Sequence, residues 1–309
     1  QPGPQPGPKP EPIPEVENPF TFECIEDGEV IFQEMTEGGV PTNVNLEVST
    51  NNKDWNTVNV SKSAEEPLYN AKFNCVAGEK LYFRGDNETF SVLGEDNIGI
   101  NFFLCSTGKW AVRGNIMSLL KPTNFSSLDT IPSDSSGCFA ALFTIPGLLF
   151  DKEHNETFTN LVDASKLVLP ATNLAKSCYY AMFLECDLLE SAPALPATLM
   201  AEECYTYMFG RCSALKTAPD LPAPTANLRK GCYDYMFRES GVEHLKVGFD
   251  QNAFIDSTSS QPYTNRWLIP AEEVNSSIKN EKNFYWKGTV IPTIRNNSTI
   301  PESWTISNY

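Results

Sequence analysis

The middle of the chain repeats one short motif. It reads CYYAMF at residues 178–183, returns as CYTYMF at 204–209, and returns again as CYDYMF at 232–237. The copies begin 26 residues apart (178 to 204) and then 28 residues apart (204 to 232). A period of this length is typical of proteins that stack one supersecondary unit many times. The repeat therefore predicts a stacked architecture for this part of the chain.

The segments between the motifs repeat as well. CDLLESAPALP at 186–196 matches CSALKTAPDLP at 212–222, and a weaker copy of the motif, CFAALF, stands at 138–143. The weaker copy begins forty residues before the next one (138 to 178), so we expect its extra length to form an inserted loop at 151–163. Four related units are thus expected, of which the first is the most divergent.

A unit of this size cannot bury its own apolar face, but stacked units cover one another. Leu189, Ala192 and Leu195 have the spacing L-x-x-A-x-x-L of a strand in a leucine-rich repeat. The apolar i, i+4, i+5 spacing of the CYxxMF motif predicts a short helical turn on the other side of each unit. Prolines such as Pro193 and Pro196 end each strand. Each stacked unit adds one coil to the structure, and we expect a small parallel sheet with one strand per coil.

The region before the repeats has a period of two. In FTFEC at 20–24 apolar and polar residues alternate, and turn residues such as Gly and Asn separate several segments of this kind. Short strands at this spacing predict a two-sheet β-sandwich over 20–120. A disulfide between Cys24 and Cys75 is not expected, because nothing in the sequence establishes its geometry and Cys105 would be left over.

The chain therefore divides into four predicted parts, and its fold class is mainly β. Residues 1–19, which begin QPGPQPGPKPEPIP, form a proline-rich and disordered stalk. The sandwich at 20–120 is followed by a leucine-rich-repeat-like solenoid at 121–248. The repeat pattern weakens after 237 and is lost near 248, so 249–309 is predicted to be a C-terminal cap region.

The composition excludes several functions. The net charge of −16 comes from 39 acidic and 23 basic residues. A nucleic-acid partner is not expected, since phosphate binding needs a basic surface. No run of eighteen apolar residues is present, so no transmembrane span is expected. The two histidines, His154 and His244, stand far apart and outside any nucleophile signature, which argues against an enzyme with a histidine base. A pair of carboxylates acting on a glycosidic bond stays open as an alternative.

The repeated cysteines and tyrosines have a structural and a chemical interpretation. We expect the cysteine columns to be buried small hydrophobes, because zinc sites need closer pairs and no C-x₂-C occurs. No metal and no cofactor are expected. Tyr179, Tyr205 and Tyr233 recur at one position and are interpreted as the roof of the core, with a ladder for sugars as the alternative. The variable positions of the repeat are the better ligand-binding candidates, namely Glu190, Ser191, Ala194, Lys216, Thr217 and Asp220.

The repeats resemble those of the BspA-like leucine-rich-repeat surface proteins of gut Bacteroidetes. GNIMSLL at 114–120 resembles the segment of that family that joins the N-terminal β-domain to the repeats. IPESWT at 300–305 resembles its C-terminal closing motif. The resemblance implies export, commonly with a lipid anchor upstream of the residues given, and an extracellular or outer-surface location. It also implies adhesion or ligand capture, and it carries over no catalytic residues.

Two function classes follow from these observations. The first is a cell-surface or secreted binding protein that captures a host or microbial surface protein or glycan through its repeat surface. The alternative is a carbohydrate-active enzyme or a glycan-binding accessory protein. A glycan site would have a concave aromatic pair flanked by carboxylates, whereas a protein-binding face would be broad and shallow.

Overall fold

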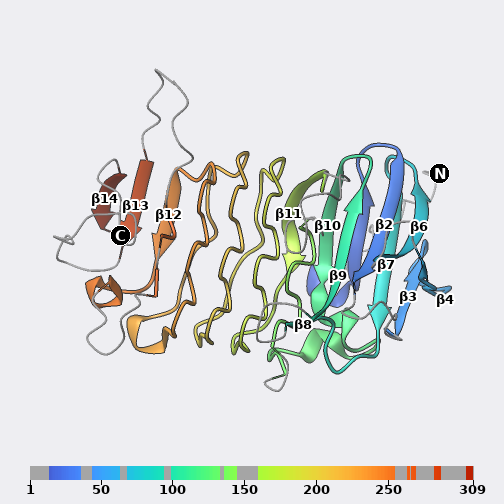
Figure 1. Cartoon of the computed structure of the whole chain (residues 1–309), viewed down its shortest axis with the longest axis horizontal. Coiled ribbons are helices and arrows are strands. Elements are labelled where there is room, and N and C mark those ends of the chain that lie inside the picture. The colour runs from blue at the N-terminus through green and yellow to red at the C-terminus, as the bar shows by residue number, and fades with distance from the viewer. Residues whose placement is uncertain are drawn as a thin grey trace, which may run out of the picture.

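The computed structural model gives the chain a mainly β architecture with three open sheets (Figure 1). It describes residues 14–35, 44–62, 68–93, 99–132, 136–144, 159–254, 263–264, 266–268, 282–286 and 304–308. Residues 1–13 of the predicted stalk and most of the predicted 151–163 loop lie outside these ranges. Within the described ranges, no helix has the length and apolar character that a membrane crossing requires.

Most elements are short strands. They are β1 (Phe20–Cys24), β2 (Gly28–Met35), β3 (Leu46–Ser49), β4 (Asn56–Thr57), β5 (Ser61–Lys62), β6 (Leu68–Cys75), β7 (Lys80–Gly85), β8 (Val92–Leu93), β9 (Gly99–Ser106), β10 (Trp110–Asn115), β11 (Leu161–Val168), β12 (His244–Val247), β13 (Lys282–Trp286) and β14 (Trp304–Asn308). The helices are 3₁₀ turns: η1 (Glu15–Glu17), η2 (Ile116–Leu119), η3 (Phe125–Ser127), η4 (Thr225–Asn227) and η5 (Gln251–Phe254).

Two sheets make up the N-terminal region. One has the order β11-β10-β1-β7-β3-β4 and the other β5-β6-β2-β9-β8. Their apolar sides share one core, in which Phe73 of β6 contacts Phe83 of β7 with ring centroids 6.3 Å apart. A disulfide joins Cys24 of β1 to Cys75 of β6, so the expectation that these cysteines stay unpaired is wrong. Their Cα atoms lie 6.2 Å apart. This geometry depends on how two sheets pack, which the sequence spacing alone does not reveal.

The segment GNIMSLL at 114–120 fastens the end of β10. Gly114 has φ +74°, and a Cβ there would overlap the carbonyl oxygen of Pro19, so only glycine fits. The buried Asn115 side chain donates to the Val16 carbonyl at 3.1 Å and accepts from the Met117 N–H at 3.0 Å. With η1 and the paired Pro19, these bonds give residues 14–19 a defined structure. The predicted disorder over 1–19 is therefore wrong for this last part of the stalk.

Both N-terminal sheets continue into the repeats. β11 lies parallel to β10 as one further strand of its sheet, so Leu161–Asp163 belong to a strand and not to the expected loop. In the other sheet, the Leu104 N–H of β9 donates to the Leu142 carbonyl at 2.8 Å. The core is also continuous across the junction, since Phe143 of the first repeat contacts Trp110 with ring centroids 5.7 Å apart. The first coil is thus built directly on the ends of both sheets.

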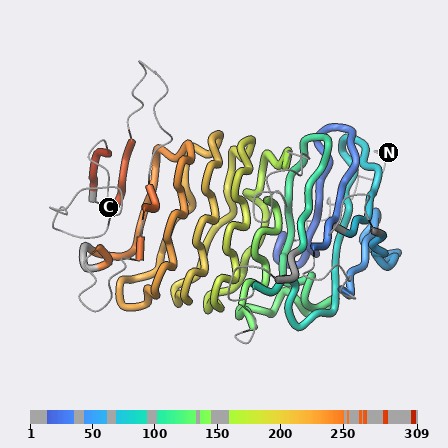
Figure 2. Tube along the Cα trace, viewed as in Figure 1, coloured from blue at the N-terminus to red at the C-terminus, as the bar shows by residue number. Residues whose placement is uncertain are grey.

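The coils lie side by side between β11 and β12, as the labels of Figure 1 and the trace of Figure 2 show. We call residues 177–186, 203–212 and 231–240 the turn segments of the three complete repeats. In each of them alternate residues bond within the coil and between coils. The Tyr180 N–H donates to Ser177 O at 3.0 Å and closes a turn, whereas the Tyr179 N–H donates to Cys204 O of the next coil at 3.1 Å. In 177–186 every backbone N–H donates one of these two kinds of bond.

This arrangement replaces the predicted helical turn. Every fourth residue of a turn segment has a positive φ, including Ala181 at 52°, Tyr207 at 58° and Tyr235 at 55°. A left-handed residue at each fourth position keeps the chain from closing consecutive i→i−4 bonds. The apolar spacing of CYxxMF suits a helix and this turn series equally, because both place the same side chains inward. The helical interpretation was therefore wrong in its backbone, although the same residues are buried.

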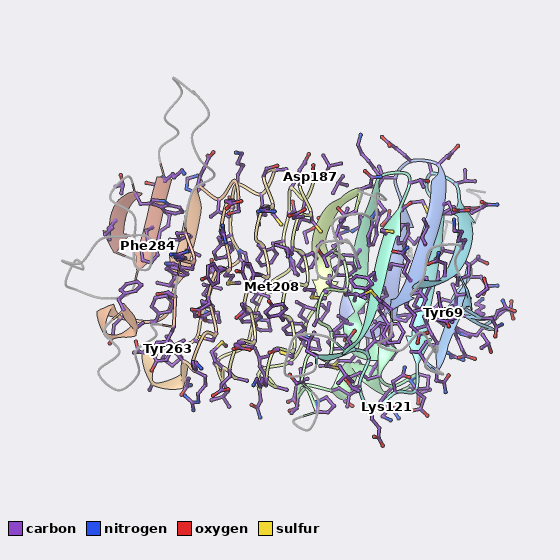
Figure 3. All side chains as sticks on the ribbon, viewed as in Figure 1. Tyr69, Lys121, Asp187, Met208, Tyr263 and Phe284 are labelled. Atoms are coloured by element: carbon purple, nitrogen blue, oxygen red, sulfur yellow. A yellow bond between two sulfur atoms is a disulfide. The ribbon has the colours of Figure 1, made fainter. Side chains whose placement is uncertain are left out.

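Identical positions of successive coils stack inside the core. The Phe143, Phe183, Phe209 and Phe237 rings follow one another at centroid distances of 5.0, 5.2 and 5.8 Å. Met208 is buried in the core of the coils, while Asp187 is exposed at their edge (Figure 3). The cysteine columns are buried as free thiols, as expected. Stacking like on like gives every coil the same cross-section, which is why one motif suffices for all of them.

The second half of each repeat forms less sheet than predicted. We call residues 189–197 and 215–223 the proline segments. Parallel bridges such as Asp163↔Ser191 and Thr217↔His244 join these segments to their neighbours, but no named strand lies within either of them. Proline has no N–H to donate to a ladder, and each segment contains two. One strand per coil is therefore found only at the ends of the stack, in β11 and β12.

The C-terminal end of the stack is closed by aromatic residues. β12, β13 and β14 form a parallel three-stranded sheet. The fully buried Trp267 contacts Tyr233 of the last turn segment at 6.3 Å and Phe284 of β13 at 6.1 Å between ring centroids. The hydrogen-bond ladder also continues, since the Phe237 N–H donates to Trp267 O at 2.9 Å. The last complete coil is thus covered on its outer side.

Replacing Phe209 by alanine should destabilise the protein strongly. Its ring is buried between Phe183 and Phe237, so its loss leaves a cavity that costs about 3 to 5 kcal/mol. Lys216→Ala, at an exposed position of the same repeat, should cost less than about 0.5 kcal/mol. Urea denaturation of both variants measures the difference. Equal small losses would mean that the stacked core is not what holds the coils.

Thiol titration should give a different number of reactive thiols for the native, the unfolded and the reduced protein. The chain has nine cysteines, of which two form the disulfide and seven are buried free thiols. A bulky disulfide reagent should find no reactive thiol in the native protein, because buried thiols are not accessible as thiolates. Unfolding without a reductant should expose seven, and reduction should expose all nine. Nine reactive thiols before reduction would contradict the Cys24–Cys75 bond.

Candidate functional site

The structure places all six predicted binding residues on the exposed surface. They lie on the proline segments: Glu190, Ser191, Ala194, Lys216, Thr217 and Asp220. Two of them already have partners in the next coil, since Lys216 Nζ lies 3.2 Å from Glu243 Oε1 and Asp220 Oδ2 lies 3.6 Å from Lys246 Nζ. The charges of these exposed residues are thus partly matched within the protein.

The recurring tyrosines of the first motif position are buried. Tyr179, Tyr205 and Tyr233 are at most 2% exposed and stack with ring centroids 5.8 and 6.1 Å apart. The interpretation as part of the core is confirmed, but their hydroxyl groups are not at the rim. Those of Tyr179 and Tyr233 are buried without a hydrogen-bond partner. This column therefore offers no ladder for an external ligand.

A pocket opens instead on the outer side of the turn segments. Its volume is about 310 Å³, and it is lined by Tyr180, Leu184, Glu185, Tyr207, Gly210, Arg211 and Arg238. These residues come from three successive coils, at positions that face outward from the turn series. The pocket is open to solvent and contains aromatic, aliphatic and charged groups together. It is the candidate functional site.

Gly210 creates the space for this pocket. The aligned positions one coil before and one coil after carry Leu184 and Arg238, whose side chains form two of its walls. The φ of Gly210 is not among the positive values, so its backbone does not require glycine. A Cβ at Gly210 would stand 2.9 Å from Leu184 Cδ1, which is closer than van der Waals contact, so the Leu184 side chain that lines the pocket would have to move. Glycine at this position thus leaves room for the Leu184 side chain and is not needed for its backbone conformation.

The aromatic part of the pocket has two walls at a steep angle. The Tyr180 and Tyr207 rings lie 6.1 Å apart between centroids, with 70° between their planes. Tyr207 is stacked on Tyr235 of the next coil at 4.6 Å and 5°. The position aligned with Tyr207 in the preceding coil is Ala181, which leaves room for the Tyr180 ring beside it. The walls are therefore fixed by packing between coils.

The charged groups that line the pocket belong to one network across three coils, which Glu239 completes from outside the lining. Arg211 bonds Glu185 of the preceding coil and, through Nε, Glu239 of the following coil at 2.8 Å. Arg238 donates from Nε to Glu239 at 2.9 Å and lies over the Tyr235 ring at 5.8 Å. Two cations and two carboxylates meet, so the network is close to neutral. Its members hold one another in place before any ligand arrives.

The pKa shifts at this site follow from burial and from the ion pairs. Burial raises the pKa of Tyr180 to about 12. The hydrogen bonds that Arg211 donates to Glu185 and Glu239 raise the pKa of Arg211 further. Burial acts to raise the pKa of Glu239, but hydrogen bonds from Arg211 and Arg238 outweigh it and hold this pKa below its ordinary value. At neutral pH the tyrosines are therefore protonated and the Glu239 carboxylate is ionised.

The histidines give no second site in the described part of the chain. His244 Nδ1 lies 3.4 Å from the Asn283 side-chain amide, while His154 lies outside the described residues. Across the described ranges, no three His, Cys, Asp or Glu side chains gather as metal ligands would.

Sequence reasoning missed the pocket because it ranked repeat positions by variability within the proline segments only. The turn segments vary as well: Leu184, Gly210 and Arg238 are aligned, and so are Glu185, Arg211 and Glu239. A glycine between two large side chains, beside a Glu-Arg-Glu column, is a signal that the sequence contained.

Comparison with known proteins adds no relative. No protein-family model, no curated protein and no solved structure matches the chain.

The stability of the protein should fall above about pH 9. Burial raises the pKa of Cys204 to about 12 from its ordinary 9.0 and raises the pKa of Tyr205 well above 10.0. The unfolded chain then loses these protons first, so the stabilisation is complete below about pH 9 and is lost as the pH rises towards 12. Urea melts across this range measure the decline. It should persist in about 1 M salt, which screens surface repulsion but not burial; a flat profile would argue against the buried columns.

Proposed function

We propose that this protein is a non-catalytic, cell-surface or secreted binding protein that captures its ligand at the pocket around Gly210. In this proposal the coils of 121–248 are a short leucine-rich-repeat-like solenoid between an N-terminal β-sandwich and a C-terminal cap region. The repeats, the GNIMSLL segment and the Trp304 region carry the resemblance to BspA-like surface proteins. The observation that carries the binding function is a pocket built from three coils with its charges already matched.

Binding fits the pocket better than catalysis does. A glycosidase needs one carboxylic acid with a raised pKa beside a second carboxylate. Glu185 and Glu239 are both bonded to Arg211, and the pKa of Glu239 is lowered. Glu239 is therefore ionised at neutral pH and has no proton to donate. The Tyr180 hydroxyl, with its pKa of about 12, is also a weak proton donor and a weak nucleophile.

An extracellular or outer-surface location is part of the proposal. The Cys24–Cys75 disulfide supports it, because such bonds persist in oxidising compartments. The proline-rich start of the chain would serve as a stalk between a lipid anchor and the folded body. The net charge of −16 disfavours nucleic acid, so the partners in this proposal are a host or microbial surface protein or a glycan.

Two leucine substitutions test the location of the site. Gly210→Leu places at 210 the residue type that the preceding coil has at the aligned position, Leu184, and its side chain should obstruct the pocket. Ala194→Leu adds a side chain of the same size to the exposed proline segment. We expect the first to weaken binding at least about tenfold on arrays of glycans and of extracellular matrix proteins, and the second to leave it unchanged.

The measurement compares each array signal with that of the unsubstituted chain, after circular dichroism has verified that both variants are folded. The reverse pattern, with binding lost in Ala194→Leu and kept in Gly210→Leu, would move the site to the proline segments.

A further inference from the structure

We propose that the pocket around Gly210 recognises one neutral hexopyranose unit of a glycan. This inference rests on the proposed binding function and names the chemistry of the ligand. It is argued from four properties of the pocket: its size, its charge, its aromatic walls and the supply of hydrogen-bond donors and acceptors.

The size of the pocket favours a small unit. Its volume of about 310 Å³ is at the lower end of ligand pockets, which span roughly 300 to 1,000 Å³. A stable protein partner instead covers about 800 Å² on each side. A single ring with its hydroxyl groups would occupy this pocket, while the rest of a glycan could leave through its open side.

The charge of the pocket favours a neutral ligand. Arg211 is bonded by two carboxylates, and Arg238 shares one of them. An acidic ligand would have to compete with Glu185 and Glu239 for the same guanidinium groups. It would also approach a protein with a net charge of −16. A phosphate or carboxylate group therefore gains little here.

The guanidinium groups still have donors to offer. Each carries five N–H groups, more than the bonds to the carboxylates require, and each carboxylate has further lone pairs. A sugar hydroxyl both donates and accepts, so it can bridge an arginine N–H and a glutamate oxygen. Because Arg211 is held from both sides, it loses little conformational freedom when it binds.

The aromatic walls favour a puckered ring over a flat one. The 70° between the Tyr180 and Tyr207 planes excludes a parallel sandwich of a flat ring between these two tyrosines. One face of Tyr207 is already occupied by Tyr235. A pyranose presents C–H groups in more than one direction, and these can pack against Tyr180 and the Leu184 side chain together. The pocket thus combines apolar contact with polar groups at its rim.

Saturation-transfer NMR and calorimetry on the full chain test this inference. The probes are the methyl glycosides of glucose, galactose, mannose and N-acetylglucosamine, with glucuronic acid, sialic acid and uridine as comparisons. We expect transfer from tyrosine protons to the C–H groups of at least one neutral glycoside. Gly210→Leu should abolish it. Arg238→Leu keeps an apolar wall but removes the donors, and should weaken binding about tenfold.

Ala226→Leu adds the same side chain at an exposed position outside the pocket and outside the six predicted binding residues; it is the matched control and should bind like the unsubstituted chain. Equal or tighter binding of an acidic sugar or of uridine would overturn the assignment, as would the absence of any neutral glycoside signal at about 10 mM probe. If a protein on the array depends on Gly210 while no glycoside binds, the sugar assignment fails and the binding site stands. If neither array has a signal that depends on Gly210, both fail.

Discussion

The structure depends on how the turn segments satisfy their backbone. In the segment 177–186 half of the N–H groups close turns within the coil, and the other half donate to the coil that follows. Unpaired backbone groups are costly in a buried setting. A single coil is therefore not a stable object, and each coil needs a neighbour on both sides. The two N-terminal sheets provide the first neighbour, and the segment around Trp267 provides the last.

The same constraint prepares the candidate site. Backbone bonding in register brings aligned positions of three coils close together, so a residue on one coil meets its equivalents on the next. At Leu184, Gly210 and Arg238 this creates a gap between two side chains, and at Glu185, Arg211 and Glu239 it creates an ion-pair column. The pocket therefore arises where aligned side chains differ between coils, while the backbone of the turn segments is the same in each coil.

The sequence predicted the properties that depend on side-chain character and missed those that depend on backbone geometry. The periodic apolar residues correctly indicated the stacked core, the buried cysteines and the mainly β fold. The left-handed turns were missed, although glycine at 137 and 231 aligns with Ser177 and Glu203, all four with positive φ. The Cys24–Cys75 bond and β11 depend on distances between segments remote in sequence, which no local pattern encodes. The predicted binding residues were placed correctly on the surface, but the pocket lies elsewhere.

In the turn segments, the backbone hydrogen bonds between coils all run in one direction. The peptide group between Cys178 and Tyr179 accepts from Phe139 on one side and donates to Cys204 on the other, and the next coils repeat this order. Peptide dipoles are thus aligned along the stack as they are along an α-helix, at right angles to the chain. The row of turn segments thereby acquires an electric polarity with its negative end toward the N-terminal sheets, although the described residues contain no α-helix. An extra coil could therefore be inserted only in the same orientation as its neighbours. A reversed coil would place its carbonyl groups opposite the carbonyl groups of the adjacent coil.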